Sequence, residues 1–217
     1  MRIKYISLLI ALIGIAALYT LSLFAQAPSI ELSQLPAYEN EIVTTQGTIT
    51  KYYQNDYGNQ IITIRNNNTT ATIFASVPAT VQSGDTIQAT GKVEHYKETW
   101  EIIIDDPKDL TIIKKWNETT IQLWEIAQNP ITYVECNLNV TGYIDSIYES
   151  SLYFTDNNFE HTILVMISKK ENITFYPGEP VVLSAQLLYD STQLKYFFSL
   201  SETYHHLQPI TEETIDD

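Results

Sequence analysis

The sequence is poor in cysteine and in basic residues. Cys136 is the single cysteine among 217 residues, so the chain forms no intrachain disulfide and offers no multi-cysteine zinc site. Lysine and arginine together number 12 against 26 aspartate and glutamate residues, which gives a net charge of −14. A surface of this charge repels polyanions at long range. Because the chain has neither disulfides nor a multi-cysteine zinc site, its folding must depend on an apolar core.

The common catalytic motifs are also missing. The sequence has no Gly-rich phosphate loop, no Gly-x-Ser-x-Gly elbow, no His-Glu-x-x-His and no paired-cysteine metal motif. His205 and His206 with Glu202 leave one enzymatic hypothesis, a metal-assisted hydrolase, although adjacent residues of a strand point to opposite faces. The sequence favours a non-catalytic protein, for which we expect no cofactor and no metal site.

A long uncharged segment stands at the N-terminus. Residues 6–25 carry no charge, and a helix of that length spans about 30 Å, the thickness of the hydrocarbon core of a bilayer. Arg2 and Lys4 precede the segment and the next charged residue is Glu31. We therefore expect residues 1–28 to be a single-pass membrane anchor, with a cytoplasmic N-terminus and an extracytoplasmic body. Ala25-Gln26-Ala27 resembles a signal-peptidase site, so a cleaved signal peptide is the alternative.

The rest of the chain contains an internal repeat. Tyr38, Val43, Gly47 and Ile49 recur 95 residues later as Tyr133, Leu138, Gly142 and Ile144, while Gly84-Asp85 and Gly91 recur 94 residues later as Gly178-Glu179 and Ala185. A nearly constant offset over such a distance indicates two copies of one unit. We expect one domain at 29–115, a second at 116–208, and an acidic tail at 209–217.

Each copy shows five short segments rich in Ile, Val, Thr and Tyr and separated by turn residues. The expected strands are 43–52, 61–64, 70–77, 86–96 and 100–104 in the first copy, and 137–148, 151–155, 162–167, 180–189 and 193–200 in the second. Short lead-ins are expected at 32–35 and 121–127, the second being a short helix capped by Asn117 and ended by Asn129-Pro130.

The repeated glycines indicate how the strands close. Gly47 and Gly142 lie inside the long first strand, where we expect a bulge or a sharp bend. Gly84 and Gly178 lie in the turn before the fourth strand, where we expect positive φ. A bent first strand allows a small closed barrel without exposed edges. The predicted fold is all-β, with two tandem five-stranded barrels after an N-terminal transmembrane helix.

The repeated pattern, with Gly84-Asp85, Gly91, Val93 and Tyr96 in the first copy, resembles the OB-fold. It is similar in particular to the tRNA-anticodon/helicase-type nucleic-acid-binding OB domains of membrane-anchored archaeal proteins. The resemblance implies that single-stranded nucleic acid binds across the second and third strands and their loops. The residues that we expect to form this site in the first domain are Lys51, Tyr52, Tyr53, Tyr57, Arg65, Phe74, Lys97 and Trp100.

Charge distinguishes the two copies. Residues 29–115 contain 7 basic and 11 acidic residues, a net charge of −4, whereas residues 116–217 contain 3 and 15, a net charge of −12. Nucleic-acid affinity depends mainly on neutralised phosphates, so only the first domain is a plausible binder of nucleic acid. The alternative partner of this acidic, tyrosine-rich body is a glycan or a protein of the cell envelope.

Overall fold

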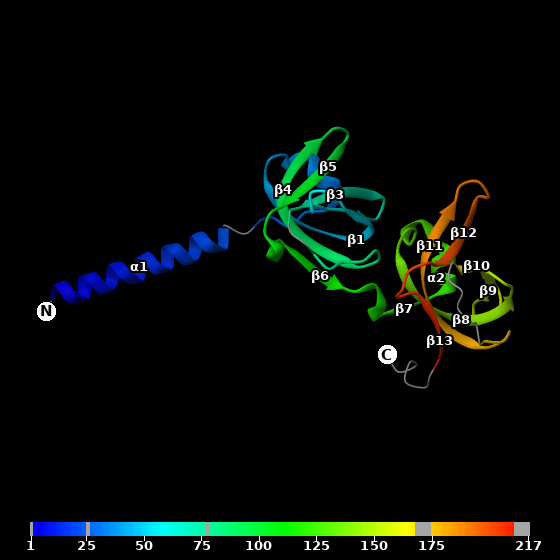
Figure 1. Cartoon of the computed structure of the whole chain (residues 1–217). Coiled ribbons are helices and arrows are strands. Elements are labelled where there is room, and N and C mark those ends of the chain that lie inside the picture. Colours follow the sequence, from blue (N-terminus) through cyan, green and yellow to red (C-terminus); the bar gives the residue numbers. More distant parts are fainter. Residues whose placement is uncertain (1, 25–26, 77–78, 168–174, 211–217) are drawn as a thin grey trace.

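The computed structural model describes residues 2–24, 27–76, 79–167 and 175–210. Helix α1 (Arg2–Phe24) stands apart from two β-barrels that follow one another along the chain (Figure 1). Each barrel has its own apolar core. The all-β, two-barrel architecture expected from the repeat is therefore confirmed.

Five strands close the first barrel. It contains η1 (Leu32–Tyr38), β1 (Ile42–Gln54), β2 (Gln60–Asn66), β3 (Thr69–Ala75), β4 (Thr86–Tyr96), β5 (Thr99–Ile104), η2 (Pro107–Asp109) and β6 (Leu110–Lys114). The strand order is β1-β2-β3-β5-β4, and β4 pairs again with β1. All of these pairs are antiparallel except β3 with β5, which is parallel. A small closed barrel of this kind is the OB architecture.

The second barrel repeats this topology. It contains η3 (Trp116–Glu118), β7 (Thr120–Gln122), α2 (Leu123–Gln128), η4 (Pro130–Thr132), β8 (Asn137–Ile147), β9 (Ser151–Thr155), β10 (Thr162–Ile167), β11 (Pro180–Asp190), β12 (Lys195–Leu200) and β13 (His206–Pro209). The order is β8-β9-β10-β12-β11, and β11 pairs with β8 to close the barrel. Among these five strands, only the third and fifth, β10 and β12, pair in parallel; the added strand β7 also pairs in parallel with β8. The ten expected strands thus fold as two copies of one barrel.

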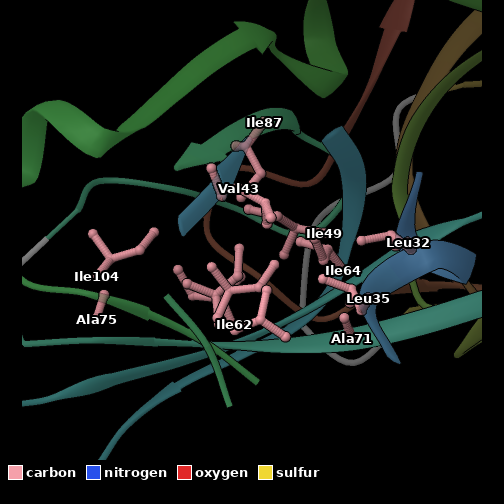
Figure 2. Packing of buried hydrophobic residues seen from close by; sticks show 14 of the residues in the cluster. Leu32, Leu35, Val43, Ile49, Ile62, Ile64, Ala71, Ala75, Ile87 and Ile104 are labelled. Atoms are coloured by element: carbon pink, nitrogen blue, oxygen red, sulfur yellow. The ribbon is translucent and has the colours of Figure 1, made fainter. Parts of the chain in front are cut away.

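Alternation along the strands builds each core. In β2, Gln60, Ile62 and Ile64 are buried, whereas Ile61 and Thr63 are half-exposed on the outer face. Apolar side chains of all five strands meet inside the barrel, together with Leu32 and Leu35 from η1 (Figure 2). The lead-in segment therefore contributes to the core of the barrel that follows it. Period-two alternation of this kind fixes which side chains remain outside for binding.

The repeated glycines have two separate roles. Gly84 and Gly178 have φ of 95° and 89°, as expected, in the turn before the fourth strand. The bulge expected at Gly47 and Gly142 lies instead two to three residues later, between Ile49 and Lys51 and between Ile144 and Ser146. At Gly142 an added Cβ would lie 2.3 Å from the backbone oxygen of Thr155. The glycine therefore permits close approach of strands, which is a different requirement from a bulge.

The short helix before β8 is correctly placed but wrongly capped in the prediction. Helix α2 begins at Leu123 after Gln122, whose side chain and that of Glu125 form a capping box. Asn117 lies in η3 instead, separated from α2 by strand β7. The helix ends at Gln128 before Asn129-Pro130, as expected. The sequence pattern missed β6, β7 and β13, which are short strands added to barrels that are already closed.

Helix α1 carries apolar side chains on all sides. Every described side chain from Tyr5 to Leu21 is exposed, including Leu12 and Leu18 at 63% and 68%. Within the described part of the chain, no helix is long and apolar enough to cross a membrane. The transmembrane helix expected over residues 6–25 stays a prediction, and residue 25 lies outside the described ranges.

Candidate functional site: a groove on the first barrel

The first barrel carries an open groove of about 830 Å³ on its outer face. It lies over β2, β3 and β5, between the end of β1 and the β4–β5 turn. Its lining residues are Tyr53, Ile61, Thr72, Phe74, Tyr96, Lys97, Glu98, Thr99, Glu101 and Ile103. This is the face on which OB barrels bind linear ligands. The volume falls within the range of small-molecule sites, but the groove is open along the strands.

Strand alternation sets the floor and walls of the groove. Ile61 pairs with Phe74 across β2 and β3, and Phe74 pairs with Ile103 across β3 and β5, so the three side chains form one apolar row. Tyr53 is paired with Ile61 and is 56% exposed. Tyr96 pairs with Thr99 beside the β4–β5 turn, lines one end of the groove and is 55% exposed. The exposed rings and the apolar floor offer surfaces on which flat groups stack.

The charges at the groove are mixed. Lys97 is in a left-handed conformation, with φ of 55°, and places its Nζ 5.1 Å from the ring centroid of Tyr96. Among the described lining residues it is the only basic side chain, and it stands beside Glu98 and Glu101. Burial, and then the carboxylate of Glu94, raise the pKa of Glu101, while Lys97 opposes the shift. The groove therefore offers stacking surfaces with little positive charge.

The structure brings three of the eight expected site residues into the groove, namely Tyr53, Phe74 and Lys97. Tyr57 lies outside the groove in the β1–β2 loop and is 90% exposed. That loop is held by Asn55, whose Oδ1 accepts hydrogen bonds from the backbone N–H groups of Tyr57 and Asn59.

Two expected aromatic residues lie outside the groove lining. Trp100 alternates with the lining residue Glu101 and packs against the barrel core, with its ring 4.6 Å from that of His95. Tyr52 is 47% exposed and alternates with the lining residue Tyr53. Successive side chains of a strand point to opposite faces. Because Tyr53 and Glu101 line the groove, their neighbours Tyr52 and Trp100 point away from it.

The other two expected residues join the barrels together. One Nη2 atom of Arg65 donates to the carbonyl oxygens of Thr132 and Val134, at 2.9 and 2.7 Å. Lys51 Nζ lies 2.7 Å from Glu135 Oε1. The positive charges of Arg65 and Lys51 are therefore directed at groups of the second barrel. They also cap carbonyl groups in the segment that precedes β8.

The segment between the barrels is fixed by further contacts. Buried Asp85 accepts a hydrogen bond from the backbone N–H of Trp116, and the indole N–H of Trp116 donates to Gln82 Oε1 at 2.7 Å. Burial raises the pKa of the Cys136 thiol to about 11, although neighbouring Arg65 opposes the shift. Cys136 is thus a packed thiol in the joint between the barrels, which comprises the linking segment and the residues of both barrels that contact it.

Several groove residues were missed by sequence reasoning. Ile61, Thr72 and Ile103 share the outer face with Phe74, so extending the alternation from Phe74 across the sheet would have found them. Tyr96 appeared only as part of the repeated pattern. The parallel pairing of β3 with β5, which brings Glu101 beside Thr72, is a tertiary feature with no local signal.

The histidines of the hydrolase hypothesis have structural partners. Nδ1 of buried His205 accepts the backbone N–H groups of Ser201 and Glu202, so Nε2 donates to Asn137 Oδ1 at 3.0 Å. His206 Nδ1 lies 2.8 Å from the carbonyl oxygen of Tyr204. Across the described ranges, no group of three or more His, Cys, Asp or Glu side chains is placed to hold a metal ion.

No protein-family profile matches this sequence, and no curated protein is significantly similar to it. Among solved structures, aspartyl-tRNA synthetase from Entamoeba histolytica is 13% identical over 41% of this chain and 22% of its own, with a TM-score of 0.35. The second OB-fold domain of replication protein A from Methanococcus maripaludis is 16% identical over 36% of this chain and 88% of its own, with a TM-score of 0.29.

The Ifi202 HINa domain, solved in complex with 20-bp double-stranded DNA, is 13% identical over 78% of this chain and 96% of its own, with a TM-score of 0.33. The chain thus spans about a fifth of the synthetase that it matches. At these TM-scores the similarities decide neither fold nor ligand. The OB assignment rests on the strand order and closure of the two barrels.

Proposed function

We propose that the protein is a non-catalytic binding module whose first barrel holds single-stranded nucleic acid by stacking bases in the groove. The observation that carries the proposal is the presence of three aromatic side chains, Tyr53, Phe74 and Tyr96, in the lining of one groove on the outer face of the barrel. Base stacking on aromatic side chains contributes about 1–3 kcal/mol per base and tolerates any sequence. Tyr57 extends the stacking surface beyond the groove.

The charge at the groove sets the character of this binding. With Lys97 as the one basic lining residue in the described groove, only about one phosphate is neutralised. For single strands the slope of log K against log salt is about −0.7 per neutralised phosphate, so we expect a slope near −0.7. Binding should be weak, insensitive to sequence and only slightly salt-dependent. A strongly basic nucleic-acid site would behave differently.

Fluorescence anisotropy tests this proposal. A labelled 12-residue oligothymidylate is titrated into the full chain at several salt concentrations. Tyr53→Ala should weaken binding about ten-fold, because one stacking partner is lost. The matched control is Tyr148→Ala, which removes an exposed tyrosine of the second barrel and should change nothing. Absence of binding at low salt, or equal losses in both variants, would contradict the proposal.

A neutral envelope glycan is the second candidate for the same groove. The observation that favours it is the presence of Glu98 and Glu101 among the lining residues, since carboxylates repel phosphates but accept hydrogen bonds from hydroxyl groups. An oligonucleotide with abasic sites keeps the phosphate backbone but has no bases. Binding of this oligonucleotide would indicate contacts to the backbone in place of base stacking or glycan binding. Competition by neutral maltohexaose, without competition by oligothymidylate, would favour the glycan.

No described helix is long and apolar enough to cross a membrane, but the uncharged segment 6–25 extends past the described end of α1 at Phe24. We also propose that this segment anchors the body to a membrane, with the body on the extracytoplasmic side. Supporting observations are the uncharged run of residues 6–25, the basic Arg2 and Lys4 before it, and exposed apolar side chains around α1. Full-length protein should stay in the membrane pellet after alkaline carbonate extraction. The double variant Leu12→Lys and Ile15→Lys should be released, since each central lysine costs about 3 kcal/mol in hydrocarbon. Release of the wild type would refute the anchor.

A further inference from the structure

The second barrel has a groove of its own, with a volume of about 660 Å³. It lies over β9, β10 and β12 and beside the β11–β12 turn, the strands equivalent to those under the first groove. In this barrel the lead-in helix α2 forms an additional wall. The lining residues are Leu123, Ile126, Ala127, Pro130, Tyr153, Glu160, His161, Thr162, Ile163, Leu164, Gln193, Lys195 and Tyr196.

Apolar and polar side chains share this lining. Helix α2 contributes Ile126 and Ala127, and strand β10 contributes Ile163 and Leu164. Two tyrosines complete the walls, and the ring of Tyr196 packs 4.9 Å from that of Tyr189. A groove that combines apolar walls with placed polar groups is suited to a small molecule.

The imidazole of His161, which lines this groove, is held in a fixed orientation by Asp156. The carboxylate of Asp156, whose residue is 4% exposed, accepts hydrogen bonds from the backbone N–H of Glu160 and from Nδ1 of His161, at 2.9 and 2.7 Å. A carboxylate only accepts, so the proton of neutral His161 resides on Nδ1. Nε2 is then an acceptor, and among the described residues it has no recorded hydrogen-bond partner.

The charged groups around His161 are two carboxylates and one cation. Glu160, in the same hairpin as His161, and Lys195 on β12 line the groove, and Asp156 contacts the ring. Helix α2 lines the groove with uncharged side chains, and its Glu125 accepts from the backbone N–H of Gln122. With a neutral imidazole the net charge of these groups is negative, which disfavours an anionic ligand.

We propose that the second-barrel groove binds a neutral amphipathic molecule, with its apolar body against α2 and β10 and a hydroxyl or N–H group donating to Nε2 of His161. This site is independent of the nucleic-acid proposal for the first barrel. It differs from the first groove in having a helical wall and a single oriented acceptor.

The test uses 4-fluorophenol, which is neutral at pH 7.5 and donates one hydrogen bond, and 4-fluoroanisole, which has the same ring but no donor. Each is titrated into the full chain in lipid nanodiscs while the side-chain ¹⁵N resonances of His161 are followed by NMR. We expect saturable shifts at pH 7.5, with the phenol binding about five-fold more tightly, as for one net hydrogen bond.

Two variants assign the effect to the groove. Ala127→Trp fills the groove from an exposed position of α2, so the fold should be kept and the shifts lost. His95→Phe replaces an exposed histidine of the first barrel and should leave phenol binding unchanged. Absence of a His161 shift at about 10 mM probe, which is ten-fold above a Kd of about 1 mM, would overturn the proposal. Equal affinities of the two probes at pH 7.5, or unchanged binding in Ala127→Trp, would overturn it as well.

Discussion

The two barrels share the strand pairings that close them and differ in the residues and elements that border their grooves. Both have the same strand order, a bulge after the glycine of the first strand, and a positive-φ glycine before the fourth strand. Their grooves occupy equivalent strands, but the first is open and bordered by Lys97, Glu98 and Glu101, whereas the second is walled by α2. The repeat therefore retains the residues that close a barrel and allows the groove residues to change.

The two barrels also differ at the turn that precedes the fourth strand of each. Gly84 and Gly178 hold equivalent positions, but Gly84 faces the linking segment, where an added Cβ would lie 2.4 Å from Asn137 O. An added Cβ at Gly178 would meet no atom of the described residues within 4 Å. One glycine is therefore needed for both conformation and space, and the other for conformation alone.

The largest expected effect comes from comparing these glycines. Gly84→Ala should lower the free energy of unfolding by about 3 kcal/mol or more, because backbone strain adds to a clash at the joint. Gly178→Ala should cost about 1 kcal/mol, from strain alone. Urea denaturation followed by circular dichroism measures both values. Equal losses would contradict the account of the joint.

The next effect distinguishes the two cations at the joint. Arg65→Met should destabilise the protein by about 2 kcal/mol, because its guanidinium donates to two carbonyl oxygens. Lys51→Met, the control of similar length, should cost less than about 1 kcal/mol, because its ion pair with Glu135 is largely solvated. Thermal unfolding of both variants gives the comparison. A larger loss for Lys51→Met would reverse our assignment of the joint.

A smaller and pH-dependent effect is expected at Asp156 of the second barrel. Burial alone raises the pKa of this carboxyl, but hydrogen bonds from His161 and from the backbone N–H groups of Glu160 and His161 outweigh it and lower the pKa. Its stabilising contribution is thus complete above the ordinary pKa of 3.8 and is lost as pH falls through the lowered value. Asp156→Asn should cost about 1–2 kcal/mol at pH 7.

The check for Asp156→Asn is a series of denaturation curves between pH 7 and pH 2. The difference from the wild type should shrink only below about pH 4. If the difference in unfolding free energy stays constant down to pH 2, the carboxylate charge of Asp156 does not stabilise the β9–β10 hairpin.

The smallest effect is expected in the first groove. Because the pKa of Glu101 is raised by burial and by Glu94, its charge destabilises the folded state at neutral pH, and the penalty vanishes as pH falls through the raised pKa. Glu101→Gln should therefore stabilise the protein by less than about 0.5 kcal/mol. It should also strengthen oligothymidylate binding about two-fold at low salt, measured by anisotropy. Weaker binding would contradict the electrostatic reading of the groove.

Much of the fold could be predicted from the sequence because closure leaves local signals. The displaced Tyr, Gly and Ile residues revealed two copies, and period-two alternation located ten strands within a few residues. The short strands β6, β7 and β13 left no such signal, since they pair at positions set only by the finished barrels. Asn117 looked like a helix cap because its type is favoured there, but an extra strand separates it from α2.

The site was predictable only in part. Tyr53 and Phe74 were found by the strands on which they lie, and Lys97 by its place near the rim. Lys51 and Arg65 looked like cations for phosphates, but their partners are Glu135 and two carbonyl groups that lie about 70 or more residues further along the chain. The orientation of one barrel against the other decides such contacts, and no local pattern encodes it.

The central claim is that the first barrel binds stacked bases while the second barrel does not take part. Backbone NMR resonances of the full chain, followed during titration with a 12-residue oligothymidylate, test it most directly. The account predicts shifts at Tyr53, Phe74 and the β4–β5 turn, with the residues around His161 unmoved. Shifts centred on the second-barrel groove, or none on the first barrel at saturating oligonucleotide, would contradict it.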